Sequence, residues 1–405
     1  MHANTVINSD FVDFIISGQG DIAFPELIKA LKTDNYKDLE NIENLIFKQE
    51  SKIITNKTNI NFDLDKLSEY PYQHLNTFYP INNYISKTFL GKRTFSYHSS
   101  FGCPFFCSFC AVVPIFKGNW IAKSAKKMHH QIIEFKNIYG IDSIEFTDNN
   151  FFTSKKRVLE FCKLIENENF TWWAEGRIDT LNNYSEQELN LLSKSGCKMI
   201  FLGAETGEDE MLKKINKGGT VSGNSIKEFV VKAKNAGIIP ELSFVLGMPD
   251  NDEKNVWKQI NSDIKFIKQI KKINKSAEII IYIYSPIPTT ENELSDELIK
   301  SGFKFPSNIE DWLNPAWENF DLRKNPLTPW LNSKMINRVK NFETVLNARY
   351  PSISDFKIKG FKKFIFQLFA FCRYALNFYS FPYELRFLQK IWKYRKPETE
   401  GFYAE

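Results

Sequence analysis

Six expected strands alternate with expected helices between residues 94 and 284 of this 405-residue chain. Each strand is a short run of apolar, β-branched or aromatic residues, and each helix is a longer amphipathic segment. The strands are expected at 94–100, 142–147, 170–175, 198–202, 240–246 and 277–284, and the helices between them at 123–139, 155–167, 186–194, 225–235 and 254–271. Strict alternation of strand and helix favours a parallel sheet with helices outside it. The chain is therefore expected to have an α/β fold.

Polar and glycine-rich stretches follow the expected strands. They are the cysteine-containing loop 101–111, Asp148, Arg177, Glu205 and Gly247. In barrel-like parallel folds the chemistry takes place at the carboxyl ends of the strands. These stretches therefore predict a functional site at one edge of the sheet.

The loop after the first strand holds Cys103, Cys107 and Cys110 within eight residues, in the spacing C-x3-C-x2-C. Thiolates this close along the chain can converge on one metal centre. A structural zinc site uses four protein ligands, and an iron–sulfur cube uses four thiolates. Three thiolates on a cube leave one iron open, and an open metal position is typical of a site that binds something reactive.

Other uses of these cysteines stay open at this point. Zinc with His98 as a fourth ligand is one, and inert thiols are another. A disulfide is not expected, because nothing in the sequence indicates a secreted chain. The remaining cysteines, Cys162, Cys197 and Cys372, are dispersed and are predicted to be small apolar residues in the interior.

The cysteine spacing and its aromatic neighbours resemble the signature of the radical S-adenosylmethionine (SAM) enzymes. This resemblance implies that Cys103, Cys107 and Cys110 hold a [4Fe-4S] cluster whose open iron chelates SAM. An electron from the cluster then cleaves SAM to a 5′-deoxyadenosyl radical. The resemblance also implies that residues 94–290 form a partial (β/α)6 barrel, and that a ferredoxin or flavodoxin type of protein donates the electron.

Further site residues follow from the same resemblance, position by position. Phe109 matches the position whose ring and backbone lie near the adenine of SAM, and Asp148 and Asn149 match the segment that binds the SAM amino group. Arg177 is expected to hold the SAM carboxylate, and Glu205 to accept from the ribose hydroxyls. An alternative is that Arg177 pairs with Glu205 or Asp179 and only ties strand ends together.

Gly247 has a simpler expected role. As a glycine it lets the backbone approach a ligand closely or turn sharply. It is therefore included among the expected cofactor-binding residues.

Residues 1–60 resemble the end of the doubly wound cobalamin (B12)-binding domain that precedes the core in one class of these enzymes. The expected elements are a strand at 11–17, a glycine-containing turn, a helix at 24–32 and a hairpin at 44–48 and 52–55. A complete domain of that kind would need about a hundred more residues upstream, and the Asp-x-His-x-x-Gly motif is absent. We therefore expect a remnant domain that binds cobalamin weakly or not at all.

Residues 61–93 are expected to be a linker, and residues 291–405 a mainly helical extension. Within the extension, 361–381 is dense in Phe, Leu and Tyr and has basic flanks. Lys, Arg and Gln interrupt it too often for a spanning helix. We favour a helix docked on the barrel; the alternatives are peripheral contact with a membrane and a lid over an apolar substrate.

The net charge of +5 is interpreted as spread along the chain, which does not indicate a nucleic-acid partner. The sequence shows no signal peptide and is expected to be cytoplasmic. The leading hypothesis is a radical SAM enzyme that carries out methyl transfer or ring cyclisation on an unknown small molecule. An apolar substrate is one option. The alternative is a non-catalytic iron–sulfur or zinc-binding partner module of a split enzyme.

Overall fold

The computed structural model describes residues 3–33, 35–50, 52–59, 62–217, 221–287, 293–318, 328–353 and 359–392. Its centre is a six-stranded parallel sheet with the order β11-β10-β9-β8-β7-β4. The strands are β4 (Thr94–Tyr97), β7 (Ser143–Phe146), β8 (Thr171–Gly176), β9 (Cys197–Glu205), β10 (Ile239–Leu246) and β11 (Glu278–Ile283). Each strand pairs with the next strand predicted from the sequence. The α/β prediction is therefore confirmed, with an open sheet whose edges are β4 and β11 among the described residues.

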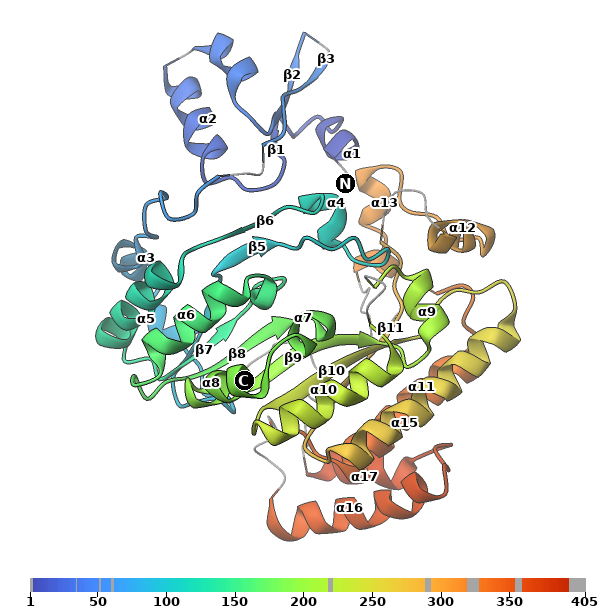
Figure 1. Ribbon diagram of the computed structural model, residues 1–405. Helices are drawn as coiled ribbons and strands as arrows, with labels where there is room; N and C mark the ends of the chain where they lie inside the picture. Colours follow the sequence, from blue (N-terminus) through green and yellow to red (C-terminus); the bar gives the residue numbers. More distant parts are fainter. Residues whose placement is uncertain are drawn as a thin grey trace.

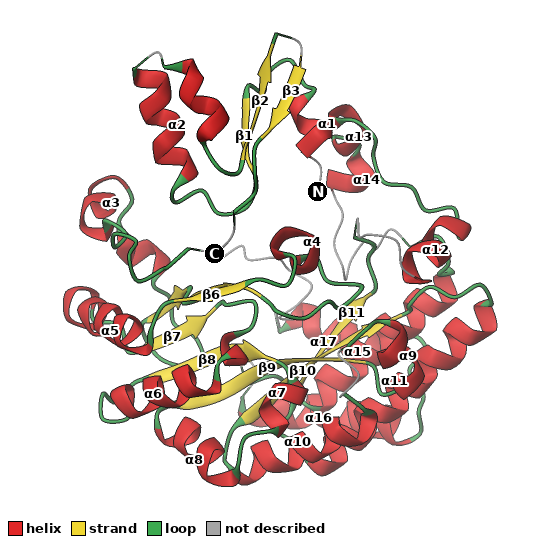
Figure 2. Cartoon of the chain, turned by 45° about the horizontal axis from the view of Figure 1, so that its top comes forward, coloured by secondary structure: helices red, strands yellow, loops and turns green. Residues whose placement is uncertain are grey.

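Helices cover one face of this sheet (Figures 1 and 2). They are α5 (Ala125–Tyr139), α6 (Lys155–Ile165), α7 (Ile178–Asn182), α8 (Glu186–Lys194), α9 (Asp209–Lys214), α10 (Gly223–Asn235) and α11 (Glu253–Ile273). A serine side chain caps four of them by accepting a backbone N–H of the first turn, and these serines are Ser124, Ser154, Ser185 and Ser222. Such caps fix where each helix begins, and thus the length of each loop at the edge of the sheet.

The two faces of the sheet differ in character because neighbouring residues of a strand point to opposite sides. Toward the helices the side chains are fully buried, as Phe146 and Trp172 are. On the opposite face the side chains are only partly buried, and they include Glu145, Trp173 and Glu175. This second, partly exposed face is here called the inner face.

A short hairpin lies beside the sheet and carries the cysteine loop. It consists of β5 (Ser100–Gly102) and β6 (Trp120–Ala122), paired antiparallel, with α4 (Val112–Phe116) between them. In Figure 2 this hairpin and α4 lie on the side of the sheet opposite α6, α8 and α10. The sequence did not predict the hairpin, because strands of three residues leave almost no periodic signal.

The N-terminal residues form a small unit with its own sheet and core. It contains α1 (Ala3–Ile7), β1 (Phe14–Ile16), α2 (Ala23–Lys32), a 3-10 helix (Tyr36–Asn41), β2 (Leu45–Gln49) and β3 (Lys52–Thr55). The strands pair antiparallel in the order β1-β2-β3. The strand, helix and hairpin are where the sequence placed them; descent from a cobalamin domain stays a prediction.

The segment after the N-terminal unit and the C-terminal residues are mostly helical. They contain α3 (Tyr72–Phe78), a 3-10 helix (Ile81–Tyr84), α12 (Glu293–Lys300), α13 (Ile309–Trp312), α14 (Pro315–Glu318), α15 (Ser333–Arg349), α16 (Gly360–Ala375) and α17 (Tyr383–Ile391). Helix α15 packs against both α11 and α16. Among the described residues, no helix combines the length and apolar character that crossing a bilayer requires.

Gly196, between α8 and β9, provides a test of how tightly the chain is packed at the amino end of β9. Its φ is +99°, and a Cβ at this position would lie 1.9 Å from the carbonyl oxygen of Phe170. Gly302 has a similar φ of +84° but has no atom within 4 Å of such a Cβ. We expect Gly302→Ala to lower the free energy of unfolding by about 1–2 kcal/mol from left-handed strain. Gly196→Ala should cost at least twice as much, because the Phe170 backbone must also move.

Urea-induced unfolding of the two variants and the parent chain measures the difference. Equal losses of unfolding free energy in Gly196→Ala and Gly302→Ala would show that the backbone between β8 and β9 is loosely packed.

Candidate functional site

The cysteine loop is held at the carboxyl edge of the sheet. Cys107 is buried, Cys103 and Cys110 are half-buried, and all three are free thiols. The loop is fastened to the end of α9 at two points: Ser108 N–H donates to the Ile215 carbonyl at 3.0 Å, and Asn216 Nδ2 donates to the Phe106 carbonyl at 2.8 Å. The loop therefore has a defined position between the hairpin and the strand ends.

Two side chains donate N–H groups to the cysteine sulfurs. Arg177 Nη1 lies 3.1 Å from Cys107 Sγ, and Asn150 Nδ2 lies 3.7 Å from Cys103 Sγ. Burial raises the pKa of the Cys110 thiol, the neighbouring Cys107 and Cys103 raise it further, and Lys217 lowers it. The three sulfurs thus lie within electrostatic reach of one another, and two of them accept a side-chain N–H group. This donor set fits a metal centre that displaces thiol protons.

The three cysteine sulfurs do not all lie within 4.8 Å of one another. Tetrahedral Zn–S bonds of about 2.3 Å place two sulfurs about 3.8 Å apart. Among the described residues, the one group of three potential ligands whose atoms all lie within 4.8 Å of one another is Glu69, His130 and Glu134, not the cysteines. His98 instead stacks on Phe101 with ring centroids 5.6 Å apart. A cluster, in which each thiolate binds a different iron, accommodates the wider spacing.

Arg177 forms hydrogen bonds to several parts of the site. Its Nε and Nη2 donate to the two carboxylate oxygens of Asp179 at 3.0 and 2.7 Å, and Nη2 also donates to the Lys217 carbonyl at 2.9 Å. The guanidinium carbon lies 3.7 Å from the Phe105 ring centroid. Burial lowers the pKa of Arg177, but the bonds to Asp179 and the charge of Cys107 outweigh it. The fork expected to bind SAM is therefore engaged by Asp179 in this structure.

Glu205 ends β9 in an unusual conformation. Its φ is +61°, which is rare for a residue other than glycine, and its side chain is buried. The pairing with β10 shifts at this point, since Ser243 pairs with Gly203 and Phe244 with Glu205. Lys217 Nζ lies 2.6 Å from Glu205 Oε1. Bulges and strained backbone are enriched at functional sites, so this strand end is a strong candidate.

Asp148 and Asn149 bind the loop that leads to the cysteines. The Asp148 carboxylate is fully buried and accepts from Ser99 N–H at 2.7 Å, Ser99 Oγ at 2.5 Å and Ser100 Oγ at 2.6 Å. Asn149 Oδ1 accepts from Gly102 N–H at 3.0 Å. Both side chains thus join the end of β7 to the β4–β5 connection.

The other two expected cofactor residues, Phe109 and Gly247, have different surroundings. Phe109 is half-buried, and Lys217 Nζ lies 5.5 Å from its ring centroid. Gly247 has a φ of +76° and its carbonyl accepts from Trp330 Nε1 at 2.9 Å. A Cβ at Gly247 would come within 2.9 Å of Leu331, so the glycine is needed for this packing.

Three residues of the site were not singled out from the sequence: Asn150, Glu175 and Lys217. Burial raises the pKa of Glu175 to about 7, and the charge of Asp148 adds to the effect. Glu175 shares the inner face with Glu145, whose pKa burial also raises. The alternation of partly buried and buried residues along β8 was the available signal for Glu175. No sequence signal pointed to Lys217.

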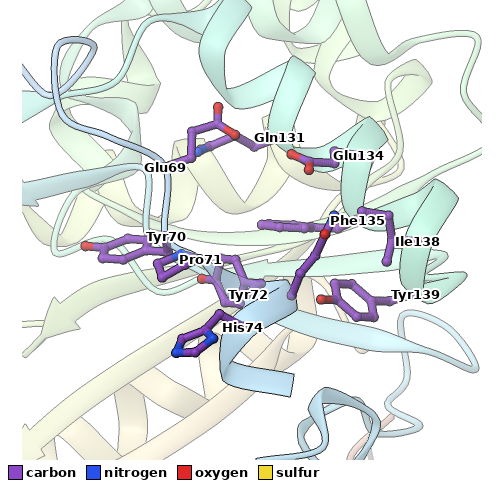
Figure 3. Close-up of a pocket in the computed structure, with 11 residues that line it drawn as sticks. Glu69, Tyr70, Pro71, Tyr72, His74, Gln131, Glu134, Phe135, Ile138 and Tyr139 are labelled. Atoms are coloured by element: carbon purple, nitrogen blue, oxygen red, sulfur yellow. The ribbon is translucent and has the colours of Figure 1, made fainter. Parts of the chain in front are cut away.

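Of two cavities among the described residues, one adjoins α4, the helix after the cysteines. One, of about 640 Å³, lies between the N-terminal unit and α4 and is lined by Ile16, Ser17, Gly18, Ile115 and Phe116, among others. The other, of about 480 Å³, lies between residues 69–74 and α5 (Figure 3). No residue of the cysteine loop lines the second cavity. The first has the size of a small-molecule pocket and adjoins the element that follows the cysteines.

Residues 97–262 match the family model of the radical SAM superfamily. The matched span contains the three cysteines, Arg177, Glu205 and Lys217. This part of the chain is thus similar to a radical SAM domain. A radical SAM domain implies a [4Fe-4S] cluster and SAM as cofactors, and the cysteine geometry above is consistent with them.

Similar proteins include methyltransferases and cyclases. The chain is 28% identical over 262 residues to the uncharacterized methyltransferase PH0819 of Pyrococcus horikoshii, covering 64% of this chain and 53% of that protein. It is 26% identical over 223 residues to the anaerobic magnesium-protoporphyrin IX monomethyl ester cyclase of Synechocystis, covering 52% and 41%. The chain therefore spans about half the length of these relatives.

A solved structure shares the fold. The cobalamin-dependent SAM radical enzyme OxsB superposes with a TM-score of 0.61 at 14% identity, covering 90% of this chain and 55% of that one. At this identity the likeness shows the fold alone, and it confirms the radical SAM core architecture predicted from the sequence.

The buried Lys217–Glu205 pair generates a stability prediction. Lys217→Met leaves the Glu205 carboxylate buried without its cation, and removing one partner of a buried pair costs about 3–5 kcal/mol. We expect Glu205→Gln combined with Lys217→Met to be less destabilised than the sum of the single variants, with a coupling of about 1–3 kcal/mol. Urea-induced unfolding of the four chains measures this coupling. Strictly additive losses would mean that the pair contributes nothing.

Proposed function

We propose that this chain is the catalytic core of a radical SAM enzyme that cleaves SAM reductively and modifies a small-molecule substrate. The observation that carries the proposal is the arrangement of Cys103, Cys107 and Cys110. They are three cysteines on one loop whose sulfurs do not all lie within 4.8 Å of one another, and two of them accept a side-chain N–H group. When bound, the cluster supplies one electron to SAM, whose sulfur–carbon bond breaks to give methionine and a 5′-deoxyadenosyl radical.

The residues around the sulfurs have supporting roles in this proposal. Arg177 and Asn150 donate to Cys107 and Cys103, which stabilises negative charge on the thiolates. Phe105 and Phe109 shield the loop from water with their rings. Because Arg177 is already bonded to Asp179, we assign it to positioning Cys107 and not to binding the SAM carboxylate.

Glu205 is the residue that we assign to SAM. Its carboxylate lies at the carboxyl end of β9 and pairs with Lys217. Lys217 Nζ also lies 5.5 Å from the centroid of the Phe109 ring. An acceptor at this place suits the ribose hydroxyls of SAM. Lys217 Nζ, 2.6 Å from Glu205 Oε1, holds the carboxylate in place at the end of β9.

The substrate is proposed to bind over the inner face of the sheet. This face presents Trp173, Phe201 and Tyr282 beside the carboxyl groups of Glu145 and Glu175. It therefore offers aromatic surface with a few hydrogen-bonding groups, the usual character of a small-molecule site. The names of the relatives favour methyl transfer or ring cyclisation as the reaction. The electron is proposed to come from a ferredoxin or flavodoxin type of donor.

Cobalamin is a separate question. The structural neighbour OxsB is described as cobalamin-dependent. The N-terminal unit of this chain has a three-stranded antiparallel sheet and not a doubly wound one. Weak or absent cobalamin binding by this chain alone therefore stays a prediction, which equilibrium dialysis with hydroxocobalamin addresses.

The proposal is tested by incubating the anaerobically reconstituted chain with SAM and dithionite. We expect 5′-deoxyadenosine and methionine in equal amounts, measured by liquid chromatography and mass spectrometry. Glu205→Gln should weaken SAM binding roughly tenfold, the value of about one lost charge-assisted hydrogen bond, while iron content stays at the parent level. Lys217→Met is the matched control that removes the ion pair but keeps the carboxylate.

Absence of 5′-deoxyadenosine from a chain with a full cluster would favour the non-catalytic module instead. Loss of iron in Glu205→Gln would show that Glu205 is structural. Equal weakening of SAM binding in Glu205→Gln and Lys217→Met would assign the effect to the pair and not to a contact with SAM.

A further inference from the structure

Helix α16 has apolar side chains on two opposite faces. One face is buried and consists of Phe366, Ala370 and Tyr374. The other is at least half exposed and consists of Phe361, Phe364, Leu368 and Phe371. At about 100° per residue, the exposed stripe lies about 140° around the helix from the buried one. A docked helix needs only one apolar face, so the second requires another explanation.

The exposed apolar residues continue into the segment after α16 and into α17. We call the whole set the C-terminal apolar surface; it consists of Phe361, Phe364, Leu368, Phe371, Leu376, Phe378, Phe381, Tyr383, Phe387 and Ile391. A Phe side chain offers roughly 150–250 Å², and each of these side chains is at least half exposed, so α16, the turn after it and α17 expose several hundred Å² of apolar area in all.

The segment that contains α16 and α17 carries the charge excess of the chain. Lys and Arg outnumber Asp and Glu by five in the whole sequence, and residues 359–392 contain six basic residues and one acidic residue. The rest of the chain is therefore balanced, which corrects the interpretation of the charge as spread along the sequence. The one acidic residue, Glu384, is bonded to Arg373. The other five cations are Lys359, Lys362, Lys363, Arg386 and Lys390.

The position of α16 decides between the interpretations of 361–381. In Figure 1 the helix lies at the lower edge of the molecule, outside α15, whereas the cysteine loop lies beside α4 at the other end. The helix therefore does not cover the site as a lid. It docks through one face, as favoured from the sequence, and presents the other face outward.

We propose that the C-terminal apolar surface docks the protein on an anionic lipid bilayer, with α16 and α17 lying in the headgroup region. Apolar side chains flanked by Lys and Arg are the composition of interfacial helices. Each basic residue near an anionic surface adds to the attraction. A second copy of the chain fits less well, because a two-fold contact brings both sets of cations together. The proposal is independent of the SAM chemistry.

The test is co-sedimentation of the full chain with lipid vesicles. We expect binding to vesicles of phosphatidylcholine with phosphatidylglycerol, at least roughly tenfold weaker binding to phosphatidylcholine alone, and weakening by added salt. Phe364→Ser combined with Phe371→Ser should reduce binding at least roughly tenfold. The matched control is Phe78→Ser on α3, which removes a Phe that is 68% exposed outside this surface and should leave binding unchanged.

A second variant separates charge from apolar contact. Lys362→Gln combined with Lys363→Gln should reduce the preference for anionic vesicles while residual binding persists. The proposal is overturned if neither vesicle binds the chain, or if Phe364→Ser with Phe371→Ser binds as the parent does. It is also overturned if the parent is a dimer in solution that these Phe substitutions dissociate, because a second copy would then cover the surface.

Discussion

The hydrogen bonds and ring contact of Arg177 join four parts of the candidate site. The guanidinium bonds the Cys107 sulfur, the Asp179 carboxylate and the Lys217 carbonyl, and it stacks on Phe105. Burial of such a charge is costly unless every donor finds an acceptor. The acceptors come from the cysteine loop, the start of α7 and the segment after α9, so the guanidinium can be satisfied only when these loops are in place together.

The carboxylate of Asp148, just after the neighbouring strand β7, is a second buried charge whose partners come from another segment. It is buried without an arginine in direct contact, and it is satisfied by one backbone N–H and two hydroxyl groups from Ser99 and Ser100. Those serines open the hairpin that leads to the cysteines. The parallel sheet brings the ends of β7, β8 and β9 to one edge, and the buried charges there fix the loop on which the cofactors depend.

The sequence predicted what local spacing encodes. Three ligands within one loop and a strand–helix alternation are both short-range signals, so the cysteines and the six strands were found. The partners of Arg177 were not fixed, because the sequence offered both Glu205 and Asp179. Lys217 was missed because its contact with Glu205, twelve residues earlier, requires the left-handed backbone of Glu205. The bounds of α15 within the predicted helical extension were not given, because its polar residues obscure the period that packing on α11 reveals.

The central claim is that Cys103, Cys107 and Cys110 hold a cluster with one open iron. The most direct measurement is iron and sulfide analysis with electron paramagnetic resonance of the reduced, reconstituted chain, with and without SAM. The account predicts about four irons per chain, a spectrum that changes on adding SAM, and loss of the cluster in each single Cys→Ala variant at these positions. Cys162→Ala and Cys372→Ala are the controls that should keep it. Full iron content in any of the three loop variants, or a spectrum unaltered by SAM, would contradict the account.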